Sequence, residues 1–129
     1  MTKNAVRFLL AAAALVAVAP QAHAGKAIDH QVSINASAHS ASGAFYAVRH
    51  SPDSTQWISC TVKMHPSSTA PELQCKAVDK FEKELFCSTF DPALVQVALG
   101  ISDYSWILFQ CDDKDLVGLT VSKSSYSQP

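Results

Sequence analysis

Alternating apolar and polar positions dominate the chain from residue 55 onward, and they predict β-strands. Within residues 55–64 the period is two, because the apolar Ile58, Cys60, Val62 and Met64 stand at every second position from 58 onward. This period of two is typical of a strand with one buried face. The alternation resumes over 73–77, after a stretch with two prolines and three Ser or Thr residues at 65–72. We therefore expect a β-hairpin whose loop spans 65–72.

Three further stretches have the composition of strands. Residues 84–90 carry apolar side chains on both faces, which favours a central strand, and residues 104–111 and 116–123 flank the polar turn 112–115.

A short helix is predicted over 91–99, between two of these strands. Asp91 is a favourable N-cap, Pro92 suits the first helical position, and Gly100 stands where a helix ends. The earlier segment 25–50 lacks such signals.

The segment 25–50 is rich in Ala, Ser and His and shows little periodicity. We expect an irregular lead-in there, with one short strand around Val32–Ile34. Residues 42–50 fit either helical turns or a strand. The patterns together predict an α+β domain over 51–124, with a small antiparallel sheet of about five strands and one short helix on one face. A polar tail at 125–129 follows.

The N-terminus reads as a signal peptide over residues 1–24. Lys3 and Arg7 precede an apolar run at 8–19, and Ala22–Ala24 forms a small-residue cleavage site. The run is shorter than the roughly twenty residues that span a bilayer. We expect a secreted or periplasmic protein that is not held in the membrane after cleavage.

Four cysteines in an exported chain favour two disulfides over free thiols or a metal site. If the hairpin loop centres on Ser68, Cys60 and Cys75 lie nearly opposite each other, as a cross-strand disulfide requires. We therefore favour the pairs Cys60–Cys75 and Cys87–Cys111. A turn before Cys87 would allow Cys75–Cys87 with Cys60–Cys111, and this alternative stays open.

Several of these residues resemble a group of small uncharacterised secreted bacterial proteins with four cysteines. The similar positions are 53–60, Cys75, Cys87, Thr89, Asp91–Pro92, 105–109, Val121 and Ser125–Tyr126. In that group the fourth cysteine tends to follow the last turn, where this chain has Leu116, whereas Cys111 precedes the turn. The resemblance supports the fold and implies no activity, since none is established for the group.

The charge excludes an obvious nucleic-acid surface. Cleavage after Ala24 leaves eight basic against 11 acidic side chains, a net charge of −3, and the lysines between 76 and 83 alternate with acidic residues. No glycine-rich phosphate loop or other cofactor motif is present, so we expect no cofactor. His30, His39, His50 and His65 have no metal-site spacing, so we expect no metal.

Two functional hypotheses follow. Trp57, Tyr104 and Trp106 form a candidate binding surface for an unknown protein or carbohydrate, with Tyr104 and Trp106 on one strand face. The alternative for Trp106 is a second small core beneath the lead-in. We expect a monomeric exported interaction protein, of which an inhibitor is one form.

The alternative is a small secreted hydrolase or ribonuclease-like enzyme. Its His50 would act with Arg49 and with Asp53, or with Glu82 and Glu84, as acid, base and cation. Whether the protein is an enzyme is uncertain from sequence, and we favour the view that it is not. No nucleophile motif accompanies these residues.

Overall fold

The computed structural model describes residues 31–123, which form seven strands and two short helices. The strands are β1 (Ser33–Asn35), β2 (Ser40–Ala44), β3 (Trp57–Lys63), β4 (Glu72–Val78), β5 (Glu84–Thr89), β6 (Trp106–Asp112) and β7 (Asp115–Ser122). The helices are α1 (Phe45–Arg49) and α2 (Pro92–Ala98). The predicted signal peptide at 1–24 and the tail at 125–129 lie outside the described residues.

The α+β prediction is wrong, because the described chain is mostly sheet. The strand order is β1-β2-β6-β7-β5-β4-β3, and the sheet is mixed because β5 runs parallel to β7. The two additional strands come from the segment 25–50: β1 overlaps the short strand expected around Val32–Ile34, and β2 lies where no strand was assigned. The core positions of β2 are occupied by the small residues Ala41 and Ala44, which are buried but give no hydrophobic alternation.

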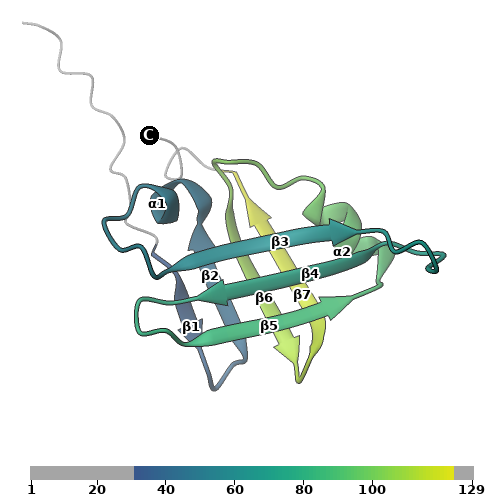
Figure 1. The fold of residues 1–129 in the computed structure, drawn as a ribbon, viewed down its shortest axis with the longest axis horizontal. Helices are drawn as coiled ribbons and strands as arrows, with labels where there is room; N and C mark the ends of the chain where they lie inside the picture. Colours follow the sequence, from purple (N-terminus) through teal and green to yellow (C-terminus); the bar gives the residue numbers. More distant parts are fainter. Residues whose placement is uncertain (1–30, 124–129) are drawn as a thin grey trace, which may run out of the picture.

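The sheet folds into two layers that cross each other (Figure 1). Strands β3, β4 and β5 form one layer, and β1, β2, β6 and β7 form the other. The layers join where Ser88 of β5 pairs with Asp115 of β7. The core lies between them, and Leu73, Ile107 and Phe109 are fully buried there. Such crossed packing lets both inner faces exclude water.

The predicted β3–β4 hairpin is confirmed. Cys60 and Cys75 are register partners, with Cα atoms 4.1 Å apart, and they form a disulfide. The second disulfide joins Cys87 to Cys111, whose Cα atoms are 5.8 Å apart. The favoured pairing is therefore confirmed and its alternative is excluded.

The predicted helix is also confirmed as α2. The Asp91 carboxylate accepts a hydrogen bond of 2.8 Å from the Ala93 amide, and Pro92 occupies the first turn. Val95 and Ala98 bury the inner face of the helix against the core. The ambiguous segment 42–50 is divided between the two predicted states, since β2 ends at Ala44 and α1 follows directly. Neither helix of residues 31–123 has the length and apolarity needed to cross a membrane.

Candidate functional site

The candidate catalytic histidine lies at the end of α1, where its ring is held by its own helix. His50 Nδ1 is 2.9 Å from the carbonyl oxygen of Tyr46, and the two rings stack with centroids 4.0 Å apart. A carbonyl only accepts, so Nδ1 must donate in this contact and carries the proton.

The other members of the proposed catalytic set do not converge on this ring. Arg49 forms an ion pair of 3.3 Å with Asp103, and both side chains are more than half exposed. The Asp53 carboxylate accepts a hydrogen bond of 2.8 Å from the Thr55 amide, so it stabilises its own turn. Among residues 31–123 no hydrogen bond or ion pair joins His50 to Asp53.

The two acidic alternatives lie elsewhere as well. Glu84 pairs with Lys76 on the outer face of the β3-β4-β5 layer. Glu82 lies in the β4–β5 turn, with a backbone φ of 62°. Neither residue belongs to the α1 corner, by which we mean α1 with His50 and the adjoining Asp103.

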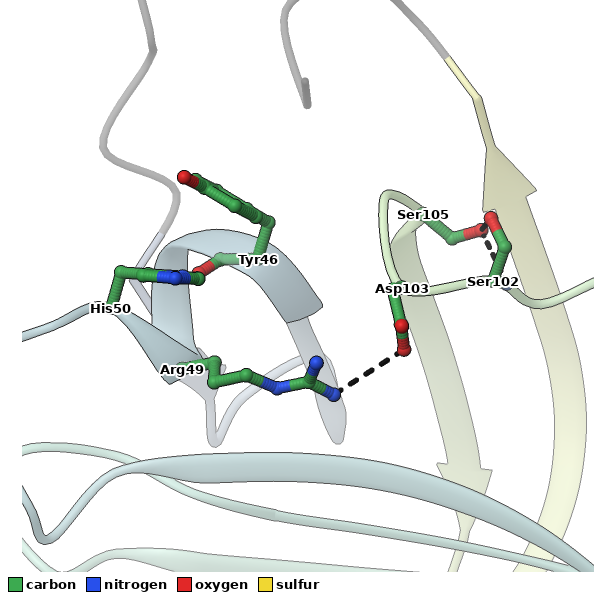
Figure 2. A network of polar contacts seen from close by, with 6 residues as sticks. All are labelled: Tyr46, Arg49, His50, Ser102, Asp103 and Ser105. Atoms are coloured by element: carbon green, nitrogen blue, oxygen red, sulfur yellow. Dashed lines mark hydrogen bonds and ion pairs between the residues drawn. The ribbon is translucent and has the colours of Figure 1, made fainter. Parts of the chain in front are cut away.

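Two serines in the loop before β6 are close to each other but not to the histidine. The Ser105 hydroxyl accepts from the Ser102 amide at 2.9 Å, and the two hydroxyl oxygens are 3.1 Å apart. Figure 2 shows both serines on the far side of Asp103 from His50. This contact therefore orders the loop and offers no Ser–His pair that could activate a nucleophile.

The three candidate aromatic residues occupy different parts of the molecule. Tyr104 lies in the loop before β6 and stacks on Tyr46, with centroids 5.7 Å apart. Trp57 lies on the outer face of β3, where the Lys76 ammonium is 5.2 Å from its ring centre. Among the described residues no ring contact joins Trp57, Tyr104 and Trp106. The binding surface predicted from these three residues stays a prediction.

Trp106 instead lines a pocket of about 470 Å³ between the β1 edge and the β4–β5 turn. The pocket is lined by Gln31, Val32, Ser33, Ile34, Ser42, Asp79, Lys80, Phe81, Lys83 and Trp106. These residues come from three distant parts of the sequence. Periodicity within one segment cannot reveal such a site, and the only signal that sequence offered was Trp106.

The turn between β4 and β5 gives the pocket a positively charged side. Lys80 and Lys83 both line the pocket. Asp79 is 5% exposed, and one of its carboxylate oxygens accepts from the amides of Phe81 and Lys83 at 2.8 and 3.0 Å. These backbone donors stabilise the buried negative charge and fix the turn.

The remaining histidines of the described chain are isolated from one another. His65 Nε2 lies 3.0 Å from the Glu72 carboxylate at the hairpin loop, and His39 lies in the β1–β2 turn. Residues 31–123 contain no group of three His, Cys, Asp or Glu side chains that could hold a metal ion. His30 lies outside the described residues.

The two disulfides are compatible with export, since oxidising compartments preserve such bonds. The resemblance to small secreted four-cysteine proteins stays a prediction from sequence. Comparison of the chain with known protein families, with curated proteins and with solved structures finds no match.

Proposed function

We propose that the protein is an exported binding protein, in the periplasm or outside the cell, whose ligand occupies the Trp106 pocket. The observation that carries this proposal is the pocket itself. Its volume of about 470 Å³ lies within the range of small-molecule sites. Four of its ten lining residues are apolar and six are polar or charged, so the wall offers both apolar contact and groups that can orient a ligand.

The state of the polar side chains at α1 supports binding over catalysis. A general base needs a free nitrogen aimed at a substrate and a partner that orients it. Among residues 31–123, His50 is oriented by the carbonyl and the ring of Tyr46, while Arg49 and Asp53 engage groups away from it. No observation at this corner favours the hydrolase hypothesis, so binding is the function that we carry forward.

The two tryptophans of the chain allow a direct test. Trp106 lines the pocket, whereas Trp57 lies on the outer face of β3. Protein labelled with 5-fluorotryptophan gives one ¹⁹F resonance for each ring, assigned with the Trp57→Phe variant. A library of small organic compounds is then screened, with the Trp57 resonance as an internal control.

We expect several compounds to shift the Trp106 resonance in a saturable way and to leave the Trp57 resonance in place. Shifts of both resonances would indicate nonspecific adsorption and would count against the pocket. A library that moves neither resonance would contradict the proposed function.

A further inference from the structure

We propose that the pocket selects a small amphiphilic organic acid, with an apolar chain or ring system that ends in one carboxylate. This inference rests on the proposed function and adds the chemical class of the ligand. It follows from the two lysines and from the four apolar residues that line the pocket.

The two pocket lysines differ from the neighbouring lysines of the same layer. Lys76 pairs with Glu84, and Lys63 donates a hydrogen bond of 2.5 Å to Gln74. No ion pair among residues 31–123 involves Lys80 or Lys83. Two ammonium groups beside one concave surface create a local attraction for an anion.

The acidic groups near this turn do not cancel that attraction. Asp79 lines the pocket, but its carboxylate already accepts two backbone amides, and it contributes one negative charge against two positive ones. Glu82 is exposed and is not a lining residue. Glu84 directly follows Lys83, but it is not a lining residue and its carboxylate pairs with Lys76. The lining itself therefore carries two positive charges against one negative charge, although the chain as a whole is acidic.

Backbone hydrogen bonds fix the turn that carries the two lysines. The Asp79 amide donates to the Lys83 carbonyl at 3.0 Å, and the Glu82 amide donates to the Asp79 carbonyl at 3.0 Å. Together with the two bonds to the Asp79 carboxylate, these contacts close the β4–β5 turn. A fixed turn reduces the entropy that binding would otherwise cost.

The rest of the lining is suited to an apolar body. Val32, Ile34, Phe81 and Trp106 line the pocket, and the first of these belongs to the core. Burial of alkyl or ring carbons against such side chains is favourable by roughly 0.8 kcal/mol per methylene group. The hydroxyl groups of Ser33 and Ser42 can donate hydrogen bonds to a carboxylate.

A matched ligand series tests this class. Octanoate, octanol and octylamine share one alkyl chain and carry a negative, a neutral and a positive head. Each is titrated by calorimetry into the oxidised protein and into its Lys80→Gln and Lys83→Gln variants. Lys114→Gln in the β6–β7 turn is the control, because this lysine is exposed and is not a lining residue.

We expect octanoate to bind most tightly and octylamine most weakly. Each pocket-lysine variant should weaken octanoate binding by about threefold or more, and Lys114→Gln should not. Equal binding of all three compounds, or octanoate binding that resists both variants, would overturn the acid class and leave the binding function standing. If no compound binds and the fluorotryptophan screen also finds none, the proposed function fails together with this inference.

Discussion

Cys87 of β5 and Cys111 of β6 form a disulfide although β7 lies between their strands in the sheet order. The bond therefore joins the two layers, whose strands cross in Figure 1, through the buried Cys87 and Cys111. Cys60–Cys75, in contrast, joins two register partners of one hairpin. The two disulfides consequently constrain different parts of the fold.

Removal of the interlayer disulfide should destabilise the protein more than removal of the hairpin disulfide. The sequence separations are 24 and 15 residues, and each bond restricts the unfolded chain by about 3 kcal/mol in the entropy model. Cys87 and Cys111 are also both buried in the core, so Cys87→Ala with Cys111→Ala additionally leaves a cavity. Urea denaturation of both double variants measures the difference. A larger loss for the hairpin pair would contradict this picture of the layers.

The cap of α2 makes a separate contribution to stability. Asp91→Ala removes the acceptor of the Ala93 amide and should lower the free energy of unfolding by about 0.5 to 2 kcal/mol. Asp91→Ser keeps an acceptor and should recover most of the loss. Thermal denaturation of both variants is the measurement, and equal melting temperatures for Asp91→Ala and the wild type would contradict a role for the cap.

Glu72 gives a pH dependence with a definite sign. Hydrogen bonds from Gln74 first, and then from His65 and Ser88, lower the pKa of Glu72 below its ordinary value of 4.5. The carboxylate form is thus favoured in the folded state, so its stabilisation is present above pH 4.5 and is lost as the pH falls through the folded pKa.

Urea midpoints measured from pH 7 to pH 3 test this sign. We expect Glu72→Gln to be less stable than the wild type at pH 7 and the difference to disappear at the acidic end. Gln74→Ala removes the first of the three donors and should raise the pKa of Glu72 toward 4.5. A difference that grows as the pH falls would contradict the assigned direction.

The Arg49–Asp103 ion pair should contribute little. Its side chains are 62% and 71% exposed, and such pairs are typically worth less than about 1 kcal/mol. A double-mutant cycle with Arg49→Gln and Asp103→Asn should therefore give a small coupling energy that high salt abolishes. A large coupling energy that survives high salt would contradict this prediction, because it would mean that Arg49 and Asp103 are held in place despite their exposure.

Local signals in the sequence predicted two kinds of element: strands with alternating apolar side chains, and a helix whose first residues are a capping Asp and a Pro. The alternation around Cys60 and Cys75 predicted both the hairpin and its disulfide, and Asp91 with Pro92 predicted α2. A short strand was predicted around Val32–Ile34, where β1 lies, but β2 was not predicted as a strand of the sheet because it buries small side chains such as Ala41, which carry almost no hydrophobic signal. The predicted antiparallel sheet of about five strands was therefore smaller than the seven-stranded mixed sheet that forms.

The candidate site was predictable only in part, for a different reason. Trp106 was selected as an exposed aromatic candidate, but the pocket that it lines needs β1 and the β4–β5 turn beside it. Contacts between segments so far apart depend on the crossing of the two layers, which no single stretch encodes. Aromatic alternation also placed Tyr104 with Trp106, whereas β6 begins at Trp106 and Tyr104 stacks on α1.

The location of the ligand site is tested most directly by a residue-resolved NMR titration of ¹⁵N-labelled protein with octanoate. We predict saturable amide shifts at Ser33, Ser42, Phe81 and Lys83, around the pocket, and unchanged amides at Tyr46 and His50. Shifts centred on the α1 corner, with the pocket amides unchanged, would contradict a binding site beside Trp106.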